Sequence, residues 1–313
     1  MGEKAIEKAR LVPRLSFINS EASMTALSMG NDFIGDATDG LKLQANIGED
    51  GIASYAKIGG GKLRQETGSH ADLHTYNAIL ALGHTNKKEK TTFEYGAFFE
   101  YGSGSYTTHN DAGQRGDGST RYTGGELLAK WTESHGLYVE GSLRAGAVKD
   151  DARDLLRDRF RGYSYETDTN YLGFSVGVGK EIRLSDGNTV DIYGKYFMNR
   201  RNSADFTVSG DKFALDAVTS SVIRIGARYT VKRGNWDFYA GAAYEHELDG
   251  KANGSANGFG IKGADTSGAS FRGELGATVR PDKNSPWSLD LNVTGVAGKK
   301  QGVTGGVSVT FGF

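Results

Sequence analysis

The last stretch of the chain, residues 303–313, reads VTGGVSVTFGF, and its pattern recurs through most of the sequence. Apolar side chains occupy odd-numbered positions, at Val303, Val307, Val309, Phe311 and Phe313. Threonine, glycine and serine occupy the even-numbered positions 304, 306, 308, 310 and 312. Alternation with a period of two predicts a β-strand with one apolar and one polar face.

The same alternation runs from residue 51 onward and predicts twelve strands. Their expected ranges are 52–58, 73–83, 91–101, 120–131, 137–148, 170–184, 188–198, 220–231, 235–246, 268–280, 286–296 and 303–313. Most have the ~9–11 residues that a tilted strand needs to cross a bilayer. An even number of antiparallel strands is typical of bacterial outer-membrane barrels. The sequence therefore predicts an all-β fold: a 12-stranded antiparallel transmembrane β-barrel over residues 51–313.

The composition excludes several other classes of protein. Of 313 residues, 46 are glycine and none is cysteine, and 37 basic against 38 acidic residues leave a net charge of −1. Without cysteine there is no disulfide framework and no thiolate metal site. The near-neutral charge gives no general attraction to nucleic acid. No apolar run approaches the ~18 residues of a spanning helix, whereas barrel strands are apolar only at every second residue.

The expected connections alternate in length along the chain. The long ones are 59–72, 102–119, 149–169, 199–219 and 247–267, and the short ones are 84–90, 132–136, 185–187, 232–234 and 281–285. The last connection, 297–302, is a short exception on the long side. Outer-membrane barrels have long external loops and short periplasmic turns. This pattern places both termini of the barrel on the periplasmic side.

The three tryptophans test the membrane interpretation independently. Trp131, Trp236 and Trp287 face outward and fall at the expected periplasmic ends of their strands. Tryptophan favours the edge of the apolar band, where its ring is buried and its N–H stays hydrated. We therefore expect these three residues to form an interface girdle. The alternative is a soluble β-sandwich whose core is this apolar face and whose other face is simply solvated.

The second face of the strands carries large charged residues of both signs. The pore-lining residues predicted from strand parity are Glu94, Glu126, Lys130, Glu140, Arg144, Asp191, Lys195, Arg224, Arg228, Glu245, Arg272, Glu274, Arg280 and Asp290. We expect these charges to neutralise one another, to keep the pore hydrated and to dock the preceding linker.

Residues 1–50 lack the alternation and form the predicted linker. Asn19 or Ser20 can cap a helix over about 20–29, and Gly30-Asn31 is a stop signal. Twelve strands spaced ~4.8 Å apart and tilted ~40° give a backbone diameter of roughly 24 Å. Side chains reduce this to a hole of about 12 Å, the width of one α-helix. We therefore expect the helix inside the pore, the alternative being a loose tail.

Several segments of the last third match a known family. They are Gly226-Ala-Arg-Tyr229, Trp236 to Tyr244 followed by Glu245-His-Glu-Leu-Asp-Gly250, Arg272-Gly-Glu-Leu-Gly276 and Gly295-Val-Ala-Gly-Lys-Lys-Gln-Gly302. Together with the alternating final strand and its terminal Phe313, they resemble the C-terminal translocator domain of bacterial autotransporters. The resemblance runs more weakly through the remaining strands.

This resemblance implies a twelve-stranded outer-membrane barrel of type V secretion, with a helical linker in the pore and an N-terminal passenger exported through or beside it. It also implies that the final strand, with Val307, Val309, Phe311 and Phe313, is the signal read by the barrel-assembly machinery. The expected partners are outer-membrane lipid, the passenger segment and that machinery, and the barrel is expected to be monomeric and to need no cofactor.

The chain departs from the family in two respects. It carries no passenger domain, so we expect it to be a fragment or a processed domain. Some family members cut the linker between two adjacent asparagines, whereas Asn19 is followed here by Ser20, which argues against self-cleavage.

Short motifs carry weaker signals. Residues 173–177, GFSVG, match a hydrolase nucleophile pattern, but that motif needs a strand–turn–helix and here it lies within strand alternation. His70 and His74 have a metal-binding spacing only on a helix, so no metal site is expected. The tripeptide Arg115-Gly-Asp117 falls in the expected loop 102–119, where polar turn composition explains it as well as adhesion does.

No catalytic residues are expected, because no nucleophile or acid–base cluster can be assembled from the sequence. The favoured function is a transport module for a passenger, and the alternative is an outer-membrane porin or small-solute channel. An outer-membrane hydrolase is the third hypothesis and lacks the residues that it would need.

Overall fold

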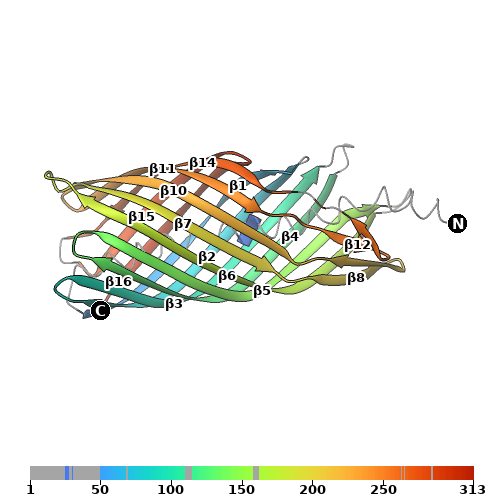
Figure 1. Ribbon diagram of the computed structural model, residues 1–313, viewed down its shortest axis with the longest axis horizontal. Coiled ribbons are helices and arrows are strands. Elements are labelled where there is room, and N and C mark those ends of the chain that lie inside the picture. Colours follow the sequence, from blue (N-terminus) through green and yellow to red (C-terminus); the bar gives the residue numbers. More distant parts are fainter. Residues whose placement is uncertain are drawn as a thin grey trace.

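The computed structural model describes residues 25–27, 30, 50–67, 70–109, 115–157, 162–261, 263, 265–282 and 285–313. Within these residues, twelve antiparallel strands close into a barrel because the first strand, β1, pairs with the last, β16 (Figure 1). The barrel order is β1-β16-β15-β14-β11-β10-β7-β6-β5-β4-β3-β2. The predicted 12-stranded antiparallel barrel is therefore confirmed.

Most of the strands are longer than alternation alone predicted. The barrel strands are β1 Asp50–Glu66, β2 His70–Lys87, β3 Thr91–His109, β4 Arg115–Glu133, β5 Leu137–Arg157, β6 Gly162–Arg183, β7 Thr189–Arg201, β10 Val218–Arg233, β11 Trp236–Asp249, β14 Gly268–Val279, β15 Trp287–Gly298 and β16 Lys300–Gly312. Ala53 pairs with Gly312, so β1 begins and β16 ends at the same end of the barrel, here called the C-terminal end. The opposite end is called the far end.

Three of the expected long loops are wrong, because most of their residues belong to strands. Residues 59–66 complete β1, 102–109 complete β3, and 149–157 complete β5. Within the expected loop 59–72, Gly59 pairs with Gly306 and Gly60 with Gly305 in the barrel seam. A Cβ added at Gly60 would collide with the Thr75 carbonyl of β2, so these glycines permit close strand packing instead of a turn.

The tripeptide at 115–117 was also placed wrongly, because it begins β4 instead of lying in a loop. Arg115 pairs with His109 and Asp117 with Thr107 in the ladder between β3 and β4. The Arg115 guanidinium forms an ion pair of 2.9 Å with Asp117, and the Thr107 hydroxyl donates to the same carboxylate at 2.9 Å. Both charged side chains of the tripeptide are therefore already paired on the surface of the strands.

A second sheet forms from the two remaining long connections. Its strands are β8 Ala204–Val208, β9 Asp211–Leu215, β12 Gly254–Ala256 and β13 Phe259–Ile261, in the order β13-β12-β9-β8. The sheet lies at the far end of the barrel (Figure 1). Phe206 stacks on Tyr165 of β6 with ring centroids 4.0 Å apart, and on Phe213 at 5.2 Å. These aromatic rings pack with inward-facing Leu73 and Tyr106 in one apolar cluster, so the small sheet packs against the inner wall of the barrel at its far end.

The two faces of the barrel have inverted polarity relative to a soluble protein. Large apolar side chains are bare on the outer face, with exposed fractions of 65% for Ile58, 64% for Leu127 and 63% for Leu143. The inner face buries charged residues such as Glu100 and Arg144. A sandwich would bury the apolar face, so the exposed apolar band excludes the soluble-sandwich alternative and fits lipid contact. Among the described helical residues, none forms a helix long and apolar enough to cross a membrane.

Candidate functional site: the charged lumen and its helix

Strand parity directs the predicted charged residues into the lumen. Glu94, Glu126, Lys130, Glu140, Arg144, Asp191, Lys195, Arg224, Arg228, Glu245, Arg272, Glu274, Arg280 and Asp290 all lie on the inward parity of the barrel strands, and each is buried or half-buried. The structure joins many of them in ion pairs between strands, so the lumen is lined by compensated charge and not by a field of one sign.

The central ion pair joins Arg144 of β5 to Glu100 of β3. The Arg144 Nε lies 3.0 Å from Glu100 Oε1, and its Nη2 lies 2.6 Å from Glu100 Oε2. The Tyr171 hydroxyl donates to Glu100 Oε1 at 2.6 Å. Side-chain exposure is 2% for Arg144 and 1% for Glu100, so the bidentate pair is fully withdrawn from water. Glu100 has the inward parity but was not among the predicted site residues.

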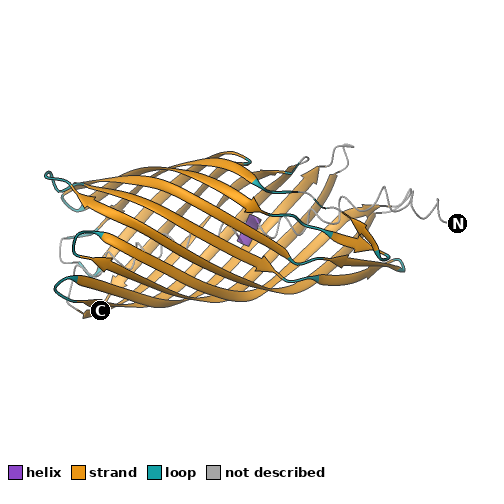
Figure 2. Cartoon of the chain, viewed as in Figure 1, coloured by secondary structure: helices purple, strands orange, loops and turns teal. Residues whose placement is uncertain are grey.

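A short helix occupies the lumen beside this pair. Thr25, Ala26, Leu27 and Gly30 are helical and buried, and the helix lies within the barrel (Figure 2). Arg144 Nη1 donates a hydrogen bond of 3.0 Å to the Leu27 carbonyl. A basic side chain that binds a helix carbonyl is favourable near the C-terminal end of a helix. The remaining residues of the predicted helix 20–29, including both of its ends, lie outside the described residues, as does the linker apart from Gly30 and Asp50.

Gly30 allows this close approach. A Cβ at this position would lie 2.7 Å from Arg144 Nη2 and 3.1 Å from the Tyr122 hydroxyl oxygen. The Tyr122 hydroxyl itself donates to Asn77 of β2 at 2.9 Å. Gly30, interpreted in the sequence as part of a stop signal, is itself helical and lies where the helix meets the barrel wall, and Asn31 lies outside the described residues.

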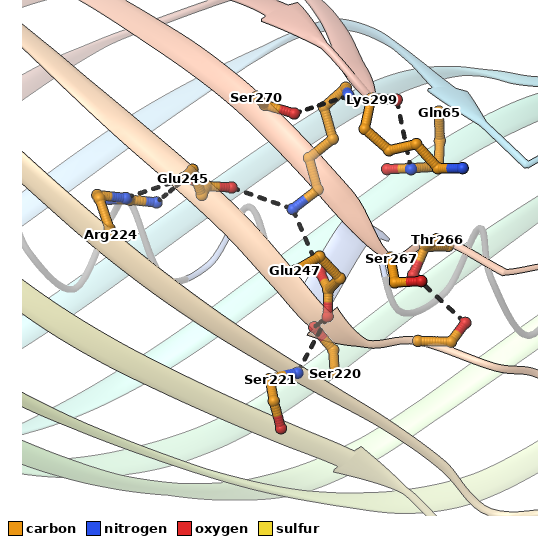
Figure 3. A network of polar contacts seen from close by, with 12 residues as sticks. Gln65, Ser220, Ser221, Arg224, Glu245, Glu247, Thr266, Ser267, Ser270 and Lys299 are labelled. Carbon is orange, nitrogen blue, oxygen red and sulfur yellow. Dashed lines mark hydrogen bonds and ion pairs between the residues drawn. The ribbon is translucent and has the colours of Figure 1, made fainter.

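A second cluster of charges surrounds Glu245 of β11 (Figure 3). Its carboxylate lies 2.9 Å from Arg224 Nη2, 3.6 Å from Arg272 Nη1 and 3.2 Å from Lys300 Nζ. Lys300 also lies 3.7 Å from Glu247, which accepts a hydrogen bond of 2.7 Å from the Ser220 hydroxyl. One buried network thus links β10, β11 and β14 with β16, which lies on the other side of β15 from β14. Sequence parity missed Lys300, because 297–302 was interpreted as a loop.

Further pairs line the lumen toward the C-terminal end. Glu140 lies between Lys195 Nζ at 2.6 Å and Lys130 Nζ at 3.5 Å. Arg228 binds Glu274 through two contacts of 2.6 and 3.1 Å. Arg280 pairs with Asp237 at 3.1 Å, and Asp290 accepts hydrogen bonds from Tyr239 and Thr278, while Tyr138 donates to Asp191. A cavity of about 700 Å³ that opens at the C-terminal end is lined by several of them, namely Asp191, Arg228, Asp237, Tyr239, Thr278 and Asp290.

Inward glycines lie beneath the longest of these bridges. The Lys195–Glu140 pair joins β7 to β5 across β6, where Gly177 lies between them: a Cβ there would be 3.0 Å from Glu140 Cγ and 3.1 Å from Lys195 Cγ. The Arg228–Glu274 pair joins β10 to β14 across β11, and a Cβ at Gly241 would lie 2.8 Å from Glu274 Cγ. The missing side chains make room for an ion pair to span three strands.

The three outward tryptophans lie at the C-terminal end. Trp236 and Trp287 begin their strands, Trp131 is paired with Phe93 near the end of β4, and all three are exposed. Trp287 packs on Phe311 with ring centroids 4.4 Å apart. Phe313 is 75% exposed, and its N–H donates to the Ile52 carbonyl at 2.8 Å. Val307 and Val309 lie on the same outward parity of β16.

The hydrolase-like residues 173–177 lie inside β6, as the alternation predicted. The Ser175 hydroxyl is 2.7 Å from the Ser142 hydroxyl of β5. A serine in the middle of an extended ladder lacks the strained turn that exposes a nucleophile. This stretch is therefore part of the barrel wall.

Comparison with known proteins agrees with the family resemblance seen in the sequence. The family model described as "Autotransporter beta-domain" matches residues 54–294, more than half of the chain. A curated relative, the autotransporter CRAC of Citrobacter rodentium (strain ICC168), is 28% identical over 129 residues. That match covers 41% of this chain and 8% of the relative, so the chain spans only a small part of the relative's length.

Solved structures of similar fold share little sequence with the chain. The β-domain of the Bordetella autotransporter BrkA has a TM-score of 0.66 at 12% identity, covering 84% of this chain and 99% of that one. The translocator domain of NalP from Neisseria meningitidis has a TM-score of 0.65 at 15% identity, covering 92% and 97%. The transport unit of AIDA-I from Escherichia coli has a TM-score of 0.60 at 12% identity, covering 88% and 98%. At these identities the likeness concerns the fold alone.

Proposed function

The chain belongs to the autotransporter β-domain family, and we propose that its barrel mediates the export of an N-terminal passenger to the cell surface. The family points to the outer membrane of Gram-negative bacteria. The outward apolar band and the polar lumen are what a barrel in that membrane requires. On this proposal the unit transports and does not catalyse.

The observation that carries the proposal is the helix held in the lumen by Arg144. The chain N-terminal to the barrel enters the pore, where the Leu27 carbonyl is bound at 3.0 Å by a guanidinium that is itself fixed by Glu100. Passage of a linker through the pore is the arrangement that joins a barrel to a segment on the other side of the membrane. A channel for small solutes has no need of a bound helix in its lumen.

The aromatic girdle and the positions of the termini support one orientation of the barrel. We place the C-terminal end, with Trp131, Trp236, Trp287 and Phe313, at the periplasmic face, and the far end with its small sheet outside. The barrel then acts as a monomer, is inserted by the barrel-assembly machinery, and contacts lipid through its apolar band. A passenger attached upstream of residue 25 leaves the lumen at the far end.

Surface exposure of a reporter tests this function. An epitope-tagged protease-sensitive domain fused before residue 1 should be cleaved by protease added to intact cells. A matched fusion whose barrel lacks residues 300–312 should leave the same reporter protected, because the barrel cannot close without β16. If the reporter stays protected although the complete barrel is folded and heat-modifiable in the outer membrane, the export proposal is wrong.

A further inference from the structure

Three metal-ligating side chains meet on the outer face of the barrel at its far end. They are His70 and Asp72 at the start of β2 and His109 at the end of β3. One ligand atom from each lies within 4.8 Å of the other two. All three side chains are half-buried, so the cluster is sheltered but reachable from solvent.

The strand geometry fixes this arrangement. His70 and Asp72 are two residues apart and therefore face the same side of β2. His70 is paired directly with His109 across the ladder. The two imidazole rings stack with centroids 4.7 Å apart and an angle of 25° between their planes. Because all three residues lie on paired strands, the backbone holds their Cβ atoms on one surface with no loop contributing a ligand.

The distances are close to those of a coordinated ion. His70 Nε2 lies 3.9 Å from Asp72 Oδ2. Two ligands bonded at about 2.0–2.1 Å to a tetrahedral zinc ion are separated by about 3.3–3.4 Å. Small side-chain rotations would close the difference. His109 also has ligand capacity to spare, because its Nδ1 is shielded from solvent and has no hydrogen-bond partner among the described residues.

We propose that His70, Asp72 and His109 bind one divalent transition-metal ion, of the Zn²⁺, Ni²⁺ or Cu²⁺ class. Two imidazoles and one carboxylate suit these ions better than Ca²⁺ or Mg²⁺, which prefer all-oxygen ligands. Three protein ligands leave a coordination position open to water or to a group from another molecule. The site joins the tips of β2 and β3 outside the lumen and is independent of the proposed export function.

Arg64 modulates this site. Its Nε and Nη2 bind the two Asp72 oxygens at 2.7 and 2.9 Å. A guanidinium at this position holds the carboxylate in place when no ion is bound, but it also repels a dication. A metal ion must therefore share Asp72 with Arg64 or displace it. Removing the Arg64 charge should strengthen metal binding, a result opposite in sign to the loss of a ligand.

Calorimetric titration of ZnCl₂ into the full chain, without an affinity tag and folded in detergent, tests the proposal. We expect one site, and at least tenfold weaker binding in His70→Ala and in His109→Ala. His74→Ala is the matched control, since His74 lies on the same face of β2 but outside the cluster, and it should bind like the parent. Arg64→Gln should bind several-fold more tightly. Heat-modifiability on gels shows that each variant is folded.

A second measurement does not depend on the folding of the histidine variants. With one equivalent of Cu²⁺, the electron paramagnetic resonance spectrum of the parent should show coupling to two imidazole nitrogens. Absence of saturable Zn²⁺ and Cu²⁺ binding to the parent would overturn the proposal. So would binding that survives both His70→Ala and His109→Ala unchanged, which would identify an adventitious surface site.

Discussion

The double substitution Arg144→Met with Glu100→Gln should release the lumen helix and open the pore. Arg144 Nη1 donates a charged hydrogen bond of 3.0 Å to the Leu27 carbonyl. Hydrogen bonds to charged groups contribute about 1.5–3 kcal/mol, and each ~1.4 kcal/mol changes an equilibrium tenfold. Losing this bond should therefore raise the ratio of open to blocked pores by roughly 10- to 150-fold.

Both partners are changed because a single substitution would confuse two effects. Arg144→Met alone would leave Glu100 as an unpaired buried carboxylate, which costs the barrel about 3–5 kcal/mol. The double variant leaves no buried charge at these two positions, so it removes the hydrogen bond from Arg144 to the Leu27 carbonyl without that penalty. Arg228→Met with Glu274→Gln is the matched control, because it removes a bidentate pair of similar geometry nearer to the C-terminal end.

Single-channel recording in planar bilayers measures the outcome. The parent should show small, flickering currents, and a variant lacking residues 1–40 should show the larger, steadier current of an open lumen. The Arg144/Glu100 double variant should spend much more time at that open level, whereas the Arg228/Glu274 control should resemble the parent. If removal of residues 1–40 leaves the current unchanged in verified folded barrels, the helix is not the plug. If that removal opens the pore but the double variant does not, Arg144 is not the clamp.

Three further predictions follow from the barrel wall. Deleting Phe313 should lower the amount of folded, heat-modifiable barrel in outer membranes, and unchanged levels would contradict its role in assembly. Arginine at the lipid-facing Ala240 should cost about 2–4 kcal/mol in equilibrium unfolding from lipid, and arginine at the lumen-facing Thr294 much less; equal costs would invalidate the face assignment. Gly241→Ala should destabilise by about 1–3 kcal/mol because its Cβ would press on a lumen ion pair. Outward Gly273→Ala meets open space and should be neutral or stabilising by up to about 1 kcal/mol, so a cost similar to that of Gly241→Ala would refute the packing argument.

The barrel and the orientation of its side chains were predictable because side chains alternate between the two faces of a strand, whichever residues are chosen as its ends. Arg144 and Glu245 keep the same parity whether their strands end at the predicted residue or continue beyond it. Strand ends, and therefore loop lengths, were less predictable. The alternation of apolar and polar residues gives no signal for a strand that continues beyond the apolar band of the membrane. Once outside the membrane, both faces of β3 and β5 carry polar residues, and the alternation that marks a strand disappears although the hydrogen-bonded ladder continues.

Two features depended on contacts that no local pattern contains. The small sheet at the far end is assembled from strands of three to five residues in two separate connections, and its central pairing joins β9 to β12, for example Leu215 to Gly254. The proposed metal site depends on the pairing of His70 with His109, whereas the sequence offered only the spacing of His70 and His74. The site could have been predicted by extending the pairing of the two adjacent strands beyond their expected ends.

The abundance of glycine, which first reads as loop composition, has a structural explanation in the lumen. A barrel of twelve strands is too narrow for long side chains to extend straight toward the axis and leave room for a helix. Arg228 and Lys195 instead lie along the wall and reach a carboxylate two strands away, which requires the strand between to carry no side chain at that level. Gly241 and Gly177 meet this requirement. The same glycines let the charges neutralise one another around the circumference, so the lumen stays polar while room remains for the helical residues 25–27 and 30.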